Sequence, residues 1–406
     1  MWKDITVEPV TILYFAAWLN YTTVSIASLY YKICEQQLDS GTGSCNDLSS
    51  FPEYEDKIQK EASTWSVYIN VALTITSLPA CLILSAYGDR RGRKLNMLVS
   101  AFGTACLLFM FAIETVFQSV SLVWLPIASF ILGTTGLSAL FSNSVFQYLS
   151  DHVTDKKTLN LRLTILGCCV SLGSIFGGLI TGVILYYFSF AWAICFGLVL
   201  LALASLYILF VLDESTDPEQ HTATLSAKSL LMDIGITFSR KLPKRCREYL
   251  FVAGISLFLY ATTDNGTDNV LPLYAFRRPF SFSPTTLNWF LAYGNFMQMT
   301  ASVPFVLMLK YFHRSDLTIC LLSMTSGLIR FLITSFSDRS WMLWLSATLG
   351  CVASVAFTSF QAFLIQIVNP DETGKVLAGS GIATNLAAIV SSGLYNLIYQ
   401  NTFEWY

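Results

Sequence analysis

The sequence predicts an all-α membrane protein, because an apolar stretch of about 20 residues recurs eleven times between Glu8 and Gln400. A helix rises about 1.5 Å per residue, so each stretch is long enough to cross a bilayer core of about 30 Å. Only 12% of the residues are charged, 54% are hydrophobic and the mean hydropathy is +0.57. A soluble domain carries about twice that share of charge. The net charge of −2 argues against a nucleic-acid partner, which needs a basic stripe.

The apolar stretches form a group of six and a group of five, separated by a charged segment. The predicted spans are residues 8–31, 64–87, 95–117, 121–148, 160–187 and 189–212, and then 249–274, 286–311, 316–336, 340–367 and 375–400. We therefore predict a six-helix half in residues 1–212, a cytosolic linker in 213–248 and a second half of five helices in 249–406.

Lys and Arg are distributed unequally between the two sides of the membrane. Sixteen of the 24 lie in or beside the loops that follow even-numbered spans, and six lie in or beside the loops that follow odd-numbered spans. Cytosolic loops are enriched in basic residues, so we predict that the even-numbered loops and the N-terminus are cytosolic. No sorting signal decides between the plasma membrane and the endolysosomal membrane.

A basic heptad, Gly88–Lys94, follows the second span. Its carboxylate, Asp89, can satisfy a neighbouring helix N-terminus or pair with an arginine, and such a contact can form in one conformation and break in another. The cations of the heptad are equally typical of a signal that keeps the loop inside. The ordered pattern resembles the loop signature of major facilitator transporters, which favours a gating role for Asp89, Arg90, Gly92 and Arg93.

Shorter segments along the whole chain resemble solute carrier family 46, which includes the proton-coupled folate transporter. They are Tyr148–Asp151, Val270–Tyr274, Ala292–Asn295, Asp371–Lys375 and Gly393–Asn396. The resemblance implies a major facilitator fold of two six-helix halves, with eleven transmembrane helices visible and the twelfth missing from the sequence. We expect a fragment or a truncated isoform; the alternative is an authentic eleven-helix protein.

Other positions depart from the folate-carrying members of that family. Their carboxylate in helix five is replaced by Gly167, their arginine in helix ten by Gln361, and their histidine in helix seven by Asp264. The expected substrate is therefore an organic anion or an amphipathic conjugate rather than folate. Those members also join their first and fourth external loops by a disulfide. The fourth external loop here has no cysteine, so the resemblance leaves Cys45 to pair with Cys34.

Two carboxylates lie within the seventh predicted span. Asp264 and Asp268 are one helical turn apart, so their side chains share a helix face, and Gly266 between them can loosen the helix. Two partly desolvated carboxylates this close resist joint ionisation, so one would hold a proton. We therefore predict a proton-coupling site here. The alternative is that the span ends near Thr262 and that both carboxylates lie in a watery outer vestibule.

Polar side chains inside other spans are candidates for substrate recognition. We predict that Asn20, Asn295 and Gln361 line a central cavity, and that Arg330 binds an anionic substrate or balances an aspartate. Hydrogen bonds between helices explain the three amides equally well. For Arg330, snorkelling to the outer interface is an equally good explanation.

Small residues in the fifth span predict close helix packing. The glycines form two pairs spaced by four residues, Gly173 with Gly177 and Gly178 with Gly182. Such pairs allow two helix backbones to approach closely.

The predicted function is secondary active transport of an organic solute by alternating access, with coupling to protons. No phosphate-binding G-x-x-x-x-G-K-[S/T] loop occurs, so ATP is not the driver, and we expect no cofactor. The three histidines are too scattered for a metal site, and no hydrolase motif points to an enzyme. The expected partners are a small-molecule substrate, protons and the lipid bilayer. The alternative function is a non-transporting membrane receptor or adaptor on the same fold.

Overall fold

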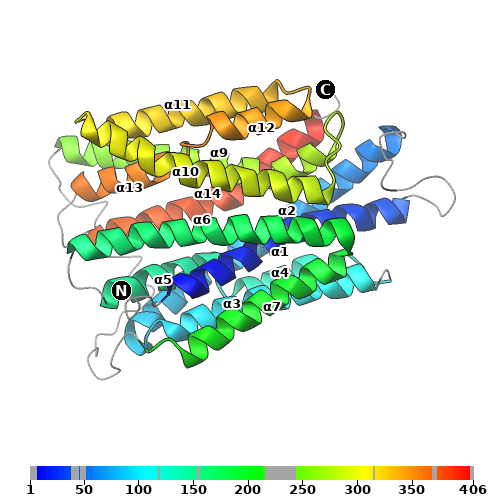
Figure 1. Ribbon diagram of the computed structural model, residues 1–406, viewed down its shortest axis with the longest axis horizontal. Coiled ribbons are helices and arrows are strands. Elements are labelled where there is room, and N and C mark those ends of the chain that lie inside the picture. Colours follow the sequence, from blue (N-terminus) through cyan, green and yellow to red (C-terminus); the bar gives the residue numbers. More distant parts are fainter. Residues whose placement is uncertain are drawn as a thin grey trace. The chain divides into compact units, whose positions relative to one another are not determined.

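The computed structural model describes residues 7–37, 45, 52–117, 119–152, 156–214, 244–313, 316–367 and 373–402. Every regular element among these residues is a helix (Figure 1). The helices of the first half are α1 (Glu8–Gln37), α2 (Pro52–Arg91), α3 (Lys94–Val116), α4 (Trp124–Gly133), α5 (Leu137–His152), α6 (Lys156–Tyr187) and α7 (Phe190–Phe210). Those of the second half are α9 (Lys244–Phe276), α10 (Pro284–Tyr311), α11 (Asp316–Ser335), α12 (Ser340–Leu349), α13 (Val355–Ile367) and α14 (Thr373–Thr402).

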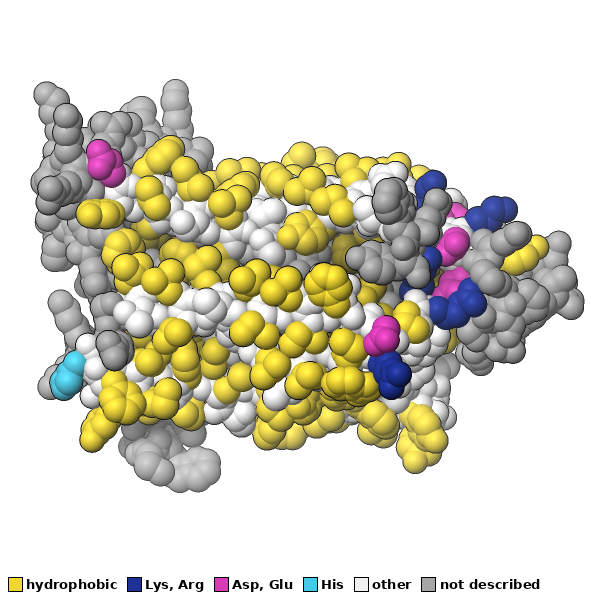
Figure 2. All heavy atoms as spheres, turned by 90° about the horizontal axis from the view of Figure 1, so that it is seen from above, with side chains coloured by type: hydrophobic (Ala, Val, Ile, Leu, Met, Phe, Trp, Pro, Cys, Tyr) yellow, Lys and Arg dark blue, Asp and Glu magenta, His cyan; other side chains and the backbone are white. Residues whose placement is uncertain are grey.

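All eleven predicted spans coincide with helices, which confirms the predicted fold class. Eight helical segments of the described chain are long and apolar enough to cross a membrane, and they match the predicted spans one to six, nine and eleven. Figure 2 shows hydrophobic side chains along the lengths of the helices in view, with the visible charged side chains toward the helix ends. This distribution is what a bilayer requires, because only internally hydrogen-bonded helices cross the hydrocarbon.

The fourth and tenth predicted spans are each broken into two helices. The first break lies between α4 and α5, where Gly136 adopts the left-handed region with φ +69°. The second lies between α12 and α13, at residues 350–354. In both breaks, backbone hydrogen bonds join residues three apart, such as Gly136 N to Gly133 O at 2.9 Å and Ala353 N to Gly350 O at 3.0 Å.

The chain divides into two compact units. The first comprises Met1–Ala223, Asn269–Ala292 and Asn396–Tyr406, and the second comprises Thr224–Asp268 and Tyr293–Tyr395. Helices α9, α10 and α14 contribute residues to both units. The predicted division of the sequence into two halves at the linker, whose residues 215–243 lie outside the described residues, therefore stays a prediction.

In the first unit, α1 packs against both α6 and α7 (Figure 1). The glycines of α6 allow this close approach, because a Cβ at Gly173 would lie 2.5 Å from the Ile12 carbonyl oxygen. A Cβ at Gly177 would overlap the backbone of Ala16. The first predicted glycine pair is therefore a contact surface for α1.

The second unit contains α11 packed against α12 and α13. A cluster of buried side chains from α9, α11 and α13 forms its core: Ala253, Leu257, Cys320, Phe360 and Leu364. This core fixes α9 relative to α11, the two helices that carry the ionisable groups described next.

A disulfide joins Cys34, which is fully buried near the end of α1, to Cys45. Their Cα atoms are 6.0 Å apart. The bond ties the end of α1 to a residue eleven positions further along the first loop.

Candidate functional site

The carboxylates of Asp264 and Asp268 lie on α9, which continues as a helix past both of them to Phe276. The helix therefore continues past Thr262, whereas the position of the two carboxylates relative to the membrane stays a prediction. Asp264 is half-buried and Asp268 is exposed. The structure thus places an acidic pair with the spacing of one turn on a continuous helix.

Arg330 of α11 interacts electrostatically with both carboxylates. The guanidinium is half-buried and belongs to the same unit as Asp264 and Asp268. Tyr260, one turn before Asp264, interacts electrostatically with all three of these groups. The arrangement comprises two carboxyl groups, one guanidinium cation and a phenol, and we call it the α9–α11 cluster. It can exchange a proton and offer a cation to an anionic ligand.

The sequence singled out three of these four residues but not Tyr260. A tyrosine in an apolar helix is usually an interfacial or packing residue. The sequence contains one signal for Tyr260. It lies four residues before Asp264, and residues four apart share a helix face.

The three amides predicted to bind substrate have different positions. Asn20 is fully buried and donates hydrogen bonds to Thr181 Oγ1 of α6 at 2.8 Å and to the Ala193 carbonyl of α7 at 3.0 Å. Gly197 makes room for it, since a Cβ there would lie 2.5 Å from Asn20 Oδ1. In this structure Asn20 therefore joins α1 to α6 and α7, which is the alternative given for the amides from the sequence. A role in substrate binding stays a prediction.

The other two amides stay predictions. Asn295 is half-buried on α10 and takes part in polar interactions. The side chain of Gln361 lies outside the described residues, although its backbone belongs to α13.

In the basic heptad, α2 continues through Asp89 and Arg90, but their side chains lie outside the described residues, so their gating role stays a prediction. Arg93 is 7% exposed, and its Nη1 donates to the Ser85 carbonyl of α2 at 3.4 Å. Gly92 turns the chain from α2 into α3 with φ +95°. The described part of the heptad is therefore folded back on its own helix pair.

Glu214, at the start of the linker, provides a carboxylate to this turn. Its Oε1 accepts a hydrogen bond from the backbone N–H of Lys94 at 3.2 Å, at the positive N-terminal end of α3. Lys94 Nζ donates to the carbonyls of Leu209 and Leu212 at 2.9 Å each, at the end of α7. Glu214 could not be identified from the sequence, because its partner is a helix end about 120 residues away in the chain.

We expect Gly92→Ala to destabilise the protein. The left-handed backbone alone costs a non-glycine residue about 1–2 kcal/mol, and the added Cβ would overlap the Glu214 carboxyl group. Equilibrium unfolding in mixed micelles would measure the loss. Gly254→Ala is the matched control, because a Cβ at Gly254 meets nothing within 4 Å. Equal stability of the two variants would contradict this account of the turn.

A second charged cluster joins α2 to the segment between α9 and α10. Arg278 Nε pairs with Glu55 Oε2 at 2.6 Å, and its backbone N–H donates to Glu55 Oε1 at 3.0 Å. Arg277 Nη2 pairs with Asp56 Oδ1 at 3.0 Å. We call these four residues the outer latch, because the predicted orientation places them outside. It joins the first predicted half to the second within one compact unit.

Hydrogen bonds extend this contact along α2 and α14. Tyr399 Oη donates to Gln59 Oε1 at 3.2 Å, and Gln400 Nε2 donates to Thr64 Oγ1 at 3.0 Å. One turn before Gln400 on α14, Asn396 Oδ1 accepts a hydrogen bond from Ser63 Oγ at 2.9 Å. The predicted outer ends of the two halves are therefore joined by a row of polar contacts.

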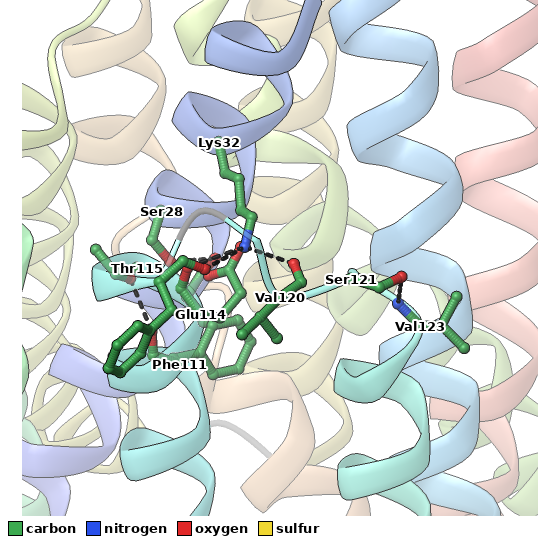
Figure 3. A network of polar contacts seen from close by, with 10 residues as sticks. Ser28, Lys32, Phe111, Glu114, Thr115, Val120, Ser121 and Val123 are labelled. Carbon is green, nitrogen blue, oxygen red and sulfur yellow. Dashed lines mark hydrogen bonds and ion pairs between the residues drawn. The ribbon is translucent and has the colours of Figure 1, made fainter.

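A buried ion pair lies between α1 and α3 (Figure 3). Lys32 Nζ lies 3.4 Å from Glu114 Oε1 and donates to the carbonyls of Glu114 and Val120 at 2.9 Å each. Lys32 is 4% exposed and Glu114 1%. Lys32 lies one residue past the first predicted span, and Glu114 lies near the outer end of the third. The structure buries both, with the ammonium at the C-terminal end of α3.

Comparison with known proteins identifies the family. Residues 10–392 match the model of the Major Facilitator Superfamily, which is most of the chain. This chain belongs to the Major Facilitator Superfamily. As a member of the superfamily it is a multi-pass membrane protein and a transmembrane transporter, as its helices also indicate.

Curated relatives in the superfamily agree with the resemblance to solute carrier family 46. A lysosomal proton-coupled steroid conjugate and bile acid symporter of Gallus gallus is 24% identical over 100% of this chain and 90% of its own length. The proton-coupled folate transporter of Rattus norvegicus is 21% identical over 98% of this chain and 86% of its own length.

Solved structures of the superfamily show the same fold. A mutant form of the nucleoside transporter NupG has a TM-score of 0.69 at 15% identity and covers 98% of this chain and 91% of its own. A D-xylose-proton symporter has a TM-score of 0.65 at 14% identity and covers 98% and 90%.

Proposed function

We propose that this superfamily member is a proton-coupled transporter of amphipathic organic anions that works by alternating access. The α9–α11 cluster carries the proposal, because it combines two acids that can hold a proton with a cation that can attract an anion. The names of the two curated relatives agree with it, since both are proton-coupled.

The roles within the cluster follow from its charges. Asp264 and Asp268 would accept the proton, and Arg330 would contact the anionic group of the substrate when the acids are neutral. The two aspartates and the anionic substrate would compete for the Arg330 guanidinium. This competition would link proton binding to substrate binding. The apolar part of the substrate would lie against apolar side chains of neighbouring spans. Asn295 and Gln361 stay candidates for substrate binding.

The membrane and the orientation are part of the proposal. The distribution of basic residues supports a cytosolic N-terminus. A lysosomal relative supports an endolysosomal membrane, where an acidic lumen would supply protons. The receptor alternative is less well supported, since the relatives reported above are transporters.

Uptake by proteoliposomes tests this function. The probes are radiolabelled estrone sulfate, taurocholate and folate, offered in acidic and in neutral medium. We expect saturable uptake of one or both amphipathic anions, stimulated by acid, and little uptake of folate. Asp264→Asn should abolish the stimulation by acid. Asp338→Asn, a change of an exposed carboxylate in the turn before α12, should leave it intact.

Two results would count against the proposal. Saturable uptake that does not depend on pH would keep the transporter and remove the proton site. Absence of uptake of both anions by correctly inserted protein would exclude the proposed substrate class.

A further inference from the structure

The break between α12 and α13 changes the backbone hydrogen bonds in the middle of the tenth span. Ala353 N–H bonds to the Gly350 carbonyl at 3.0 Å, three residues back, where a regular helix would use the Leu349 carbonyl. The Leu349 carbonyl therefore needs another donor, since a carbonyl without a partner is costly in a membrane.

Side chains of two neighbouring helices bind the break. Ser326 Oγ of α11 donates to the Leu349 carbonyl at 2.6 Å. Tyr260 Oη of α9 donates to the Ala353 carbonyl at 3.2 Å. The helices that carry the α9–α11 cluster are thus the same helices that hold the two ends of the break.

Arg330 also lies against this break. A Cβ at Gly350 would be 2.7 Å from both Cβ and Cδ of Arg330 and 2.9 Å from its Cγ. Real side chains do not approach this closely, because close-packed interiors leave no space for an extra methyl group. The stem of Arg330 therefore occupies space that exists only because residue 350 is glycine.

We propose that Gly350 and Tyr260 are positioning residues for proton coupling. Gly350 leaves the space in which the Arg330 stem lies. Tyr260 fixes the turn that carries Gly350. Together they hold the guanidinium near Asp264 and Asp268. The inference rests on the proposed function, because it concerns the same cluster.

The physical consequence follows from the charges. While the carboxylates are ionised, they attract the guanidinium and favour the arrangement described here. A proton that binds a carboxylate oxygen weakens this attraction, and Arg330 and the turn beneath it can then move together. The break lacks regular helical hydrogen bonds. It is therefore the part of the tenth span that can move with Arg330 while few hydrogen bonds are lost.

Among the residues that the structure describes, the titratable groups that interact with the cluster come from α9 and α11. Asp264 and Asp268 interact with each other and with Arg330, and Tyr260 interacts with all three and with the thiol of Cys320 on α11. Arg330 supplies the positive charge among these groups. Its displacement should therefore be visible in the pH dependence of transport.

The test compares Gly350→Ala with Gly327→Ala in proteoliposomes, with uptake of estrone sulfate and taurocholate measured across a pH series. The added methyl at 350 would push Arg330 away, so the carboxylates would lose a stabilising cation and keep their proton to a higher pH. We expect the pH of half-maximal uptake to rise by about one unit. Gly327→Ala is the control, because its Cβ would lie at an ordinary 3.4 Å from Ala353 Cβ.

Tyr260→Phe is the second variant and adds no volume. It removes the hydrogen bond to the Ala353 carbonyl and should shift the half-maximal pH in the same direction, so it decides the question if Gly350→Ala fails to fold. An unchanged pH profile in both folded variants, beside loss of acid stimulation in Asp264→Asn, would overturn the positioning role and keep the proposed function. Unchanged acid stimulation in Asp264→Asn would instead refute the proton site itself.

Discussion

Replacing Lys32 by methionine is expected to lower the free energy of unfolding by about 3–5 kcal/mol, the loss typical of a broken buried ion pair. The Lys32 and Glu114 side chains are 3% and 2% exposed. Both carboxylate oxygens of Glu114 are buried without a hydrogen-bond partner. The ammonium at 3.4 Å is the described charge that compensates them, so its removal would leave a buried anion unpaired. Unfolding by sodium dodecyl sulfate in mixed micelles, followed by tryptophan fluorescence, would measure the loss.

A double variant separates the effect of charge from that of hydrogen bonding, and a lysine elsewhere on the chain supplies the control. Lys32→Met with Glu114→Met removes both charges, so most of the loss should be recovered. Recovery should be incomplete, because the carbonyls of Glu114 and Val120 also lose the donor that Lys32 provides. Lys57→Met on α2 is the control for an exposed lysine and should change stability by less than about 0.5 kcal/mol. Equal stability of Lys32→Met and this control would refute the role assigned to the pair.

Neutralising Glu55 is expected to open the outer latch. Glu55 accepts two hydrogen bonds from Arg278, and a hydrogen bond to a charged group contributes about 1.5–3 kcal/mol. Glu55→Gln should therefore raise the population with separated outer ends by about tenfold or more. A cysteine in place of Gln59, which is fully buried beside Tyr399, would report the change. Its rate of labelling by a membrane-impermeant thiol reagent should rise by the same factor.

The neighbouring residue supplies a matched control for the latch. Asp56 is 43% exposed in its pair with Arg277, so Asp56→Asn should change the labelling rate little. Exchanging the charges, with Glu55→Arg and Arg278→Glu, should restore slow labelling in part. If Glu55→Gln labels no faster than Asp56→Asn, the latch does not hold the outer ends together.

The sequence was sufficient for the spans and for part of the cluster. Hydrophobic length identifies membrane helices because the bilayer has a fixed thickness. Asp264 and Asp268 were identifiable because charge inside an apolar stretch is rare and costly. For Arg330, the sequence could state two possible positions but could not choose between them, since the choice depends on a neighbouring helix.

Other features could not be predicted because their partners are distant in the chain. Nothing local indicates that Asn20 meets Thr181 and the Ala193 carbonyl, or that Gly197 makes room for it. The same holds for Lys32, whose acceptors are backbone carbonyls, groups that every residue has. A polar residue in a predicted span can therefore be recognised as costly before its role is known.

The positions of the two broken spans bear on the origin of the fold. They are the fourth and the tenth, equivalent places in a fold built from a repeated six-helix unit. A break present before the unit was duplicated would be inherited by both copies. The contacts at the two breaks differ, since Cys81 Sγ lies 3.5 Å from the Gly136 carbonyl at the first, whereas Arg330 lies against the second. The bend is thus common to both predicted halves, whereas the contacts beside it differ between them.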